Sequence, residues 1–262
     1  NLLATLPTYL DHLKDNNQVL VKDIERLSKT YLMSESDVNH VRRLQADLDS
    51  LEITISDMTS EQEEYSEAYS VLEERLENIQ AALKEIEDDQ VSVSERLVQI
   101  EKDDVNARQK ANVYVNRLHT IKRYMEKRNL PGIPQNFLKL FFAASHSTED
   151  LMAELEQSQV NIESVNRILE IATHDMEILE TETYSIVKYA TLTEQLLQYS
   201  NRYRSFDEGI QQAFHESLEI FENAFDYQAS FEKISQALEV AEPGVTNRFV
   251  SSYEKTRETI RF

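Results

Sequence analysis

Apolar side chains recur at alternating spacings of three and four residues through the first half of the chain, and one phase holds from Val41 to Met125. A stripe that repeats every 3.5 residues lets a helix pack continuously against its neighbours in a left-handed supercoil. The stripe consists of Val41, Leu44, Leu48, Leu51, Ile55, Met58, Gln62, Tyr65, Tyr69, Leu72, Leu76, Ile79, Leu83, Ile86, Gln90, Val93, Leu97, Ile100, Asp104, Ala107, Ala111, Tyr114, Leu118, Ile121 and Met125. Long α-helices packed side by side are therefore predicted.

Local chemistry indicates where this helical region begins and ends. Ser34 is followed three residues later by Asp37, an arrangement that satisfies the free amides of a first helical turn. Residues 129–134 read Asn-Leu-Pro-Gly-Ile-Pro, which ends a helix. Two arrangements stay open between these points. Residues 36–128 form one helix about 140 Å long at ~1.5 Å per residue, or a hairpin near residues 88–89 precedes a second helix opened by Ser92 and Glu95.

Beyond residue 134 the predicted helices differ in length and in apolar content. A helix that begins near Gln135 carries a dense set of large apolar side chains, namely Phe137, Leu138, Leu140, Phe141 and Phe142. A long helix is predicted over about residues 161–203, and two or three short ones over about 207–222, 226–241 and 244–259. We therefore expect an all-α fold of elongated helical bundles that ends in a cap of short helices.

Composition and charge narrow the function. Only 3 Gly and 4 Pro occur in 262 residues, so few positions force a helix to stop. The net charge of −21 argues against binding to nucleic acid or to an anionic membrane surface. Residues 47–104 carry a net charge of −15 and residues 105–128 one of +6. This reversal favours antiparallel packing of the two segments or a polarised binding surface, and the plainer alternative is a set of solvated helix faces.

The missing residue types exclude further classes of protein. The sequence has no Cys, which excludes disulfides and thiolate metal sites and is consistent with a reducing cytoplasm. No stretch approaches the ~20 consecutive apolar residues that span a bilayer. The chain starts at Asn1 without a Met, so we expect a fragment whose membrane anchor lies outside it.

No constellation of catalytic or cofactor-binding residues can be assembled. The glycines at 132, 209 and 244 are isolated and cannot cradle a phosphate group. The histidines at 12, 40, 119, 146, 174 and 215 lack metal-ligand spacing. Paired acids such as Glu63 and Glu64 suit solvated helix faces better than a desolvated pocket. We predict no catalytic residue, no metal site, no cofactor and no enzymatic activity; an active site assembled between helices is the less favoured alternative.

One polar cluster stands out near the end of the predicted helix 161–203. Gln198, Asn201 and Arg202 lie three and four residues apart on the side opposite an apolar stripe, and Tyr203 and Arg204 extend the cluster. Amide side chains offer donors and acceptors together, and Arg adds a planar fork for carboxylates. These five residues are the predicted partner-binding site, with ordinary solvated residues at a helix end as the alternative.

Three segments carry a family resemblance. They are residues 129–134 with the Phe-rich helix that follows, residues 192–205 and residues 237–244. With these segments the chain resembles the C-terminal half of the EzrA family of septation ring formation regulators of Gram-positive bacteria. The resemblance covers essentially the whole chain. It implies spectrin-like repeats over residues 1–128 and 129–205 and a short-helix cap over residues 206–262.

The resemblance also implies a function and a location. Members of this family bind the tubulin-like division protein FtsZ, restrain assembly of its ring, and help to recruit other division and cell-wall proteins. They are held at the cytoplasmic side of the cell membrane, at the division septum, by an N-terminal anchor that this chain lacks. Their Gln-Asn-Arg patch matches Gln198, Asn201 and Arg202. Self-association stays open, and a purely structural spectrin-like or coiled-coil spacer is the alternative function.

Overall fold

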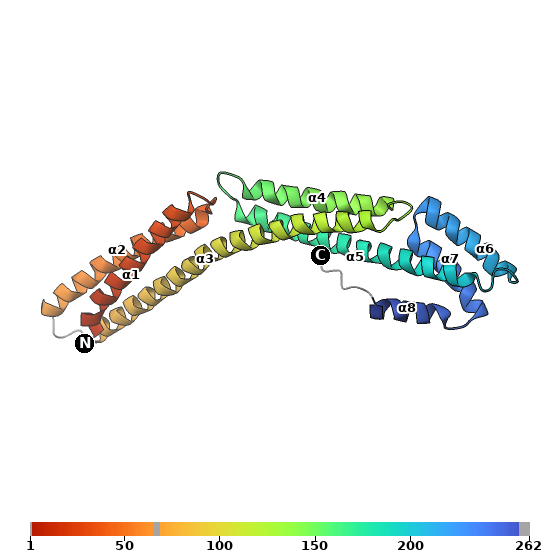
Figure 1. Ribbon diagram of the computed structural model, residues 1–262. Helices are drawn as coiled ribbons and strands as arrows, with labels where there is room; N and C mark the ends of the chain where they lie inside the picture. The colour runs from red at the N-terminus through yellow and green to blue at the C-terminus, as the bar shows by residue number, and fades with distance from the viewer. Residues whose placement is uncertain (1, 65–68, 257–262) are drawn as a thin grey trace. The chain divides into compact units, whose positions relative to one another are not determined.

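The computed structural model describes the backbone of residues 2–64 and 69–256 and the side chains of residues 5–60 and 71–256. Those residues form helices and one isolated β-bridge but no strand, which confirms the predicted all-α class. In chain order the elements are α1 (Leu2–Leu27), α2 (Glu35–Glu64), α3 (Tyr69–Lys127), α4 (Gln135–Leu155), α5 (Ile162–Ser200), α6 (Glu208–Glu219), the π-helix η1 (Ile220–Ala224), α7 (Tyr227–Ala241) and α8 (Val245–Thr256) (Figure 1). None of the helices so described is both long and apolar enough to cross a bilayer.

The chain divides into two compact units. Unit 1 contains Asn1–Arg108 and Ala153–Asn166, and unit 2 contains Gln109–Met152 and Arg167–Phe262. Helix α3 supplies its first part to unit 1 and its last part to unit 2. The expected repeat boundaries after residues 128 and 205 stay predictions.

Unit 1 is built around α1, α2 and the first part of α3, which lie side by side (Figure 1). Its core joins Leu13 of α1, Met58 of α2 and Leu83 of α3, each almost fully buried. In one straight helix Met58 and Leu83 would lie about 37 Å apart at ~1.5 Å per residue. The chain therefore reverses between α2 and α3, and the prediction of a single helix over residues 36–128 is wrong.

The alternative prediction of a hairpin near residues 88–89 is wrong as well. Helix α3 runs without interruption through Asp88 and Asp89. Ser92 caps no helix, because it lies inside α3, where its hydroxyl accepts a hydrogen bond from Arg96 Nη1 at 2.7 Å. Three stripe positions of the heptad prediction, the side chains of Gln62 and Tyr69 and the whole of Tyr65, lie outside the described residues.

Both predicted ends of the helical region are confirmed. Ser34 Oγ accepts a hydrogen bond from the Ser36 amide at 3.2 Å, and α2 begins at Glu35. At the other end α3 stops at Lys127, and Asn129 turns the chain with a φ of 53° before α4 begins at Gln135. The left-handed region suits Asn better than most residues because its short polar side chain bonds locally.

Unit 1 is closed by residues far apart in sequence. Tyr31 forms an isolated parallel bridge with Val160, with backbone hydrogen bonds of 2.8 and 2.9 Å. Beside it the buried carboxylate of Asp104 accepts hydrogen bonds from Tyr31 Oη at 3.2 Å and Arg108 Nε at 3.0 Å. Arg108 also donates to the carbonyl of Leu155 at 3.0 Å. These contacts hold the end of α4 and the start of α5 against unit 1.

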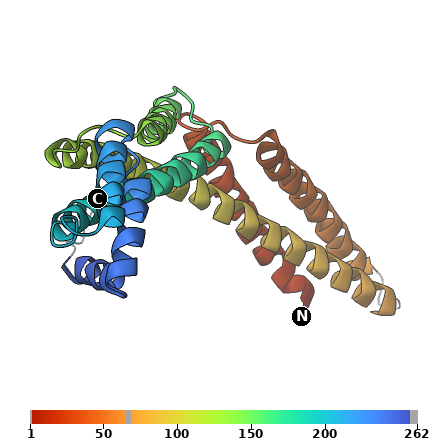
Figure 2. The same ribbon diagram turned by 90° about the vertical axis from the view of Figure 1, so that its right-hand side faces the viewer.

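Unit 2 combines the last part of α3 with α4 and α5, and α6, α7 and α8 pack around the end of α5 (Figure 2). The prediction of short helices after residue 206 is confirmed, and the predicted helix 161–203 is three residues shorter at its end because turns begin at Asn201. The core of this cap joins Leu192 and Leu196 of α5 with Ile210, Ile234 and Leu238. The cap thereby surrounds the helix end that carries the predicted partner-binding residues.

Candidate partner-binding site

The three central residues of the predicted site occupy the last turn of α5 and the turn after it. Gln198 lies inside the helix, and Asn201 and Arg202 follow its end. The backbone amides of Asn201 and Arg202 donate to the backbone carbonyls three residues earlier at 3.4 and 3.2 Å. These i→i+3 bonds tighten the chain as the helix ends. All three side chains are exposed. Within the described residues, the side-chain amide groups of Gln198 and Asn201 make no hydrogen bond, so their donors and acceptors face solvent.

Arg202 is held in place by an aromatic ring. Its Cζ lies 4.6 Å from the centroid of the Tyr199 ring, within the range of a cation–π contact. Stacking leaves the edge of the guanidinium free to donate hydrogen bonds in its own plane. Gln198, Asn201 and Arg202 therefore form one exposed group, and we call these three residues the QNR patch.

The other two predicted residues point to other neighbours. Tyr203 is half-buried, and its hydroxyl donates to Glu242 Oε2 at 2.6 Å. The guanidinium of Arg204 lies 4.4 Å from the ring centroid of Phe214 on α6. The structure thus brings the QNR patch together, while Tyr203 and Arg204 bind within the cap. Whether any of the five residues binds a partner stays a prediction.

A network behind the QNR patch ties the end of α5 to the cap. Glu242, at the end of α7, accepts hydrogen bonds from the hydroxyls of Tyr199 and Tyr203 at 2.6 Å each and from Arg248 Nη2 at 2.8 Å. Arg248 also donates to Tyr199 Oη at 3.1 Å. Because Tyr199 carries the Arg202 guanidinium on its ring, the network fixes the position of the patch from behind.

The electrostatics of this network follow from its hydrogen bonds. The donors from Tyr199, Tyr203 and Arg248 stabilise the ionised carboxylate and lower the pKa of Glu242 to about 2. The same bond to Glu242 raises the pKa of Tyr203 to about 12, since losing its proton would place two negative charges together. Sequence reasoning missed Tyr199, Glu242 and Arg248. Residues 237–244 were singled out only as a family segment, and no spacing rule links positions 39 to 49 residues apart.

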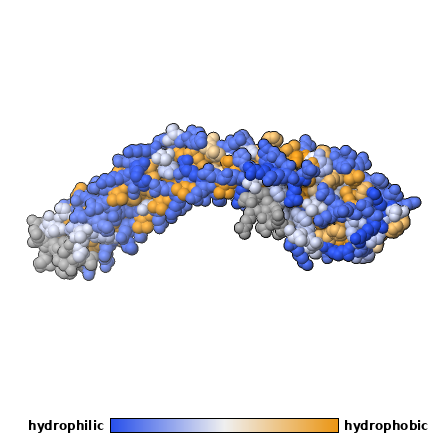
Figure 3. Space-filling view, viewed as in Figure 1, coloured by the Kyte–Doolittle hydropathy of each residue, from blue (hydrophilic) through white to orange (hydrophobic). Residues whose placement is uncertain are grey.

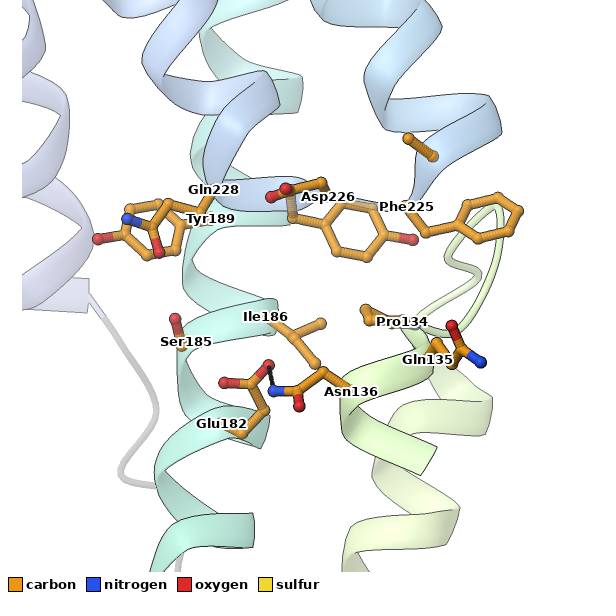
Figure 4. Close-up of a pocket in the computed structure, with 12 residues that line it drawn as sticks. Pro134, Gln135, Asn136, Glu182, Ser185, Ile186, Tyr189, Phe225, Asp226 and Gln228 are labelled. Carbon is orange, nitrogen blue, oxygen red and sulfur yellow. Dashed lines mark hydrogen bonds between the residues drawn. The ribbon is translucent and has the colours of Figure 1, made fainter. Parts of the chain in front are cut away.

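Unit 2 also contains a pocket of about 290 Å³, lined by polar and apolar side chains alike, between the start of α4, the middle of α5 and the corner before α7 (Figure 4). Asn136 Nδ2 donates across it to Glu182 Oε1 at 3.3 Å, and Ser185, Asp226 and Gln228 add further polar groups. None of its lining residues belongs to the predicted site.

The corner beside this pocket is locked to the loop between α3 and α4. Tyr227 Oη donates to the Gly132 carbonyl at 2.6 Å, and the ring of Phe225 lies so close that a Cβ on Gly132 would overlap it. Phe225 itself has a φ of 57°, which is strained for an L-residue with a bulky side chain. A side chain at residue 132 would therefore require the Phe225 ring to shift. Among the described residues, no group of three His, Asp or Glu side chains is placed to hold a metal ion.

Comparisons with known proteins place these observations in a family. No solved structure matches the chain. The family model described as "Septation ring formation regulator, EzrA" matches residues 1–253. Septation ring formation regulators EzrA of three Streptococcus pneumoniae strains, Hungary19A-6, G54 of serotype 19F and ATCC 700669, are each 76% identical to this chain over 262 residues. The alignment covers all of this chain and 46% of each relative, so the chain spans about half their length. The chain belongs to the EzrA family of septation ring formation regulators.

Proposed function

We propose that this chain acts in bacterial cell division as a non-enzymatic regulator that binds FtsZ and restrains assembly of its ring. The observation that supports this most strongly is membership of the EzrA family across residues 1–253. The QNR patch is the proposed contact. Its exposed amides and the guanidinium of Arg202 offer hydrogen-bond donors and acceptors to an extended acidic segment of FtsZ.

The surroundings of the patch favour binding to a flexible segment. The Glu242 network and the stacking of Arg202 on Tyr199 position the patch before a partner arrives. A pre-ordered surface loses less conformational entropy on binding, so the ordering cost falls mainly on the flexible partner. We therefore propose that the patch binds the C-terminal tail of FtsZ and that occupation of this tail weakens the association of filaments.

A triple variant tests the patch. Gln198→Ala, Asn201→Ala and Arg202→Ala together should abolish co-sedimentation of the chain with FtsZ filaments and its inhibition of filament formation. Arg167→Ala, Gln211→Ala and Asn247→Ala remove the same residue types from exposed positions elsewhere in unit 2 and should change neither measurement. Thermal melts by circular dichroism check that both variants fold. Unchanged binding and inhibition by the first variant would refute the patch assignment.

The tail is tested by shortening the partner. FtsZ filaments that lack the C-terminal tail should no longer carry the chain into the pellet, whereas intact filaments should. If both filaments bind the chain equally, the contact lies on the folded part of FtsZ, and the proposed mechanism is wrong even if the patch is right.

The alternative is a structural spacer. The repeated apolar stripe and the interhelical core of unit 1 favour it, because they are all that a spectrin-like or coiled-coil spacer needs. A correctly folded chain that binds neither FtsZ nor its filaments would support the spacer. Location at the cytoplasmic side of the cell membrane at the septum, self-association, and further division and cell-wall partners are part of our proposal and rest on the family resemblance.

A further inference from the structure

A groove runs between the last part of α3 and α4, on unit 2 and away from the QNR patch. Its volume is about 270 Å³, and its apolar lining comes from Val115 and Leu118 of α3 and from Phe141 and Met152 of α4. Lys122 lies on the α3 rim of the groove. An open apolar groove between two helices is the kind of surface into which a third helix can lay its apolar face.

The apolar surface continues beyond the groove. On α4, Leu138 is 42% exposed and Phe142 is 69% exposed, and the two lie four residues apart on the same side of the helix. Figure 3 shows apolar groups that interrupt a mostly hydrophilic surface, some of them over α4. A phenyl ring left in water beside an apolar groove indicates an interaction surface more than a scattered surface residue does.

The charges at this surface are mixed, with cations in excess on the α3 side and one acid, Glu149, in the lining on the α4 side. Lys122, Arg123 and Lys127 are exposed there together with Glu126, on the segment with net charge +6. Arg117 of the same helix faces α5 and pairs with Glu180 at 2.9 Å. By contrast, Lys122, Arg123 and Lys127 form no ion pair with any residue that the structure describes. The groove therefore joins an apolar floor to an α3 rim on which unpaired cations outnumber the acids, and Glu149 lies on the α4 rim.

We infer that this groove docks an acidic amphipathic helix from another protein. The helix would insert apolar residues spaced i, i+3, i+4 and i+7 beside Phe141 and Phe142 and turn its carboxylates towards Lys122 and Arg123. A short docked helix interacts electrostatically mainly with the charges at the rim of the groove, because charges are screened over about 8 Å at physiological ionic strength. A nucleic acid or an anionic membrane would extend farther and meet a chain of net charge −21.

The inference does not depend on the proposed function, and it is tested with a designed probe. The probe is a fluorescein-labelled helical peptide of about 18 residues, long enough to form a helix, with Leu and Phe on one face and Glu on the other. A second peptide has the same residues in scrambled order, and a third has Lys in place of Glu. Fluorescence anisotropy with the full chain should show micromolar binding of the first peptide and at least about tenfold weaker binding of the other two.

Variants locate the binding surface. Phe142→Ser should weaken binding of the acidic peptide by about tenfold or more, as for a central apolar contact. Lys122→Glu with Arg123→Glu should weaken it further and improve binding of the Lys peptide. Phe206→Ser, at another exposed Phe, and Lys22→Glu with Lys29→Glu should change neither affinity. These are surface positions, so the variants are expected to fold, and thermal melts verify this.

Three results would overturn the inference. They are no binding of the acidic peptide at concentrations on the order of 1 mM, equal binding of the acidic and Lys peptides, and binding that Phe142→Ser leaves unchanged. Self-association in sedimentation velocity that Phe142→Ser abolishes would assign the groove to a second copy of this chain instead. Co-sedimentation of the same variants with FtsZ separates the two proposals, because loss of peptide binding with retained FtsZ binding affects only this one.

Discussion

A single carboxylate, that of Glu242, organises the end of α5. Two tyrosine hydroxyls share its Oε2 and one arginine binds its Oε1. These three donors come from α5, the turn after it and α8. The arrangement makes the geometry behind the QNR patch sensitive to the protonation of one group at low pH and of another, Tyr203, at high pH.

The cap should therefore lose stability at both extremes of pH. The pKa of Glu242 lies at about 2 in the folded state, below its ordinary value of 4.5, so its contribution is present above pH 4.5 and is lost as the pH falls towards 2. The pKa of Tyr203 is raised from 10.0 to about 12, so its contribution is present below pH 10 and is lost as the pH rises towards 12. The thermal melting temperature should fall as the pH is lowered from 4.5 towards 2 and as it is raised from 10 towards 12, and Glu242→Gln is the control for both series.

Comparing the original chain with Glu242→Gln separates the effect of protonating Glu242 from that of protonating the other acids. Glu242→Gln should melt at a lower temperature near neutral pH, and the difference from the original chain should shrink at both extremes. A Tyr203→Phe variant should abolish the alkaline effect and reduce the acid effect in part, because it also removes one of the three donors that lower the pKa of Glu242. If the difference between the original chain and Glu242→Gln is constant with pH, the network does not stabilise the cap as described.

At the same scale, the sequence predicted the exposed residues better than the buried bonds. The three residues of the QNR patch were found because their spacing and polarity place them on one helix face. Arg204 was grouped with them by adjacency, but its guanidinium lies over Phe214. Glu242 was missed because a bond between distant residues depends on how helices pack, which no local pattern records.

At the scale of the elements, the apolar stripe predicted the helices correctly. Its continuous phase did not predict that the chain reverses its direction between α2 and α3. Its phase records which face of a helix is buried, and this face can be continuous on both sides of a chain reversal. The sequence between the end of α2 and the start of α3 contains neither Gly nor Pro, so no residue type there predicts that the helix ends. Residues 129–134, with two Pro and one Gly, were predicted without difficulty. Helix ends were thus predictable where the backbone is chemically restricted.

Three buried polar side chains of unit 1, Asn17 of α1 and the stripe members Gln90 and Asp104, have different partners. Gln90 Nε2 donates to the Leu13 carbonyl at 2.8 Å, and Asn17 Nδ2 donates to Gln45 Oε1 at 2.9 Å. The side-chain oxygens of both Asn17 and Gln90 are buried without a partner among the described residues. Asp104, in contrast, bonds both Tyr31 and Arg108. A buried polar atom without a partner costs free energy that a satisfied one does not.

Replacing the two amides should therefore stabilise unit 1. Asn17→Leu with Gln90→Leu should raise the free energy of unfolding by about 1–2 kcal/mol, because buried unsatisfied oxygens are exchanged for apolar contact. Asp104→Leu is the matched control and should lower the free energy of unfolding by about 1–3 kcal/mol, because it leaves the buried Tyr31 hydroxyl unpaired. Urea unfolding followed by circular dichroism measures both. Destabilisation by the amide replacements would show that these polar atoms are satisfied in solution.

At the scale of the whole molecule, charge is the dominant property. The chain carries 48 acidic and 27 basic residues. Exposed ion pairs such as that of Lys14 with Glu52 contribute only about 0–1 kcal/mol each. Repulsion among the unpaired acids is therefore expected to outweigh the attraction that salt would screen. The all-α class and the family could be predicted from sequence at this scale, since both depend on patterns spread over the entire chain.

Added salt should accordingly stabilise the protein. Raising sodium chloride from about 0.01 M to about 1 M shortens the screening length from about 30 Å to about 3 Å. The melting temperature of the full chain should rise over this range. Chloride is preferred to sulfate, because sulfate also strengthens apolar burial. A melting temperature that falls with sodium chloride would mean that ion pairs, and not repulsion, dominate the electrostatics of the chain.

The bridge between Tyr31 and Val160 has a consequence for synthesis on the ribosome. Unit 1 takes its last residues from Ala153–Asn166, so it cannot be completed when residue 108 has left the exit tunnel. The rest of α3 and all of α4 must first leave the exit tunnel before Gln159 Nε2 can donate to the Ser28 carbonyl, 131 residues away. Until then the apolar side of α3 near Asp104 lacks its final cover. Vectorial translation thus leaves an early folding unit open for roughly fifty to sixty residues after its main body has emerged, the stretch from residue 108 to residues 159–166.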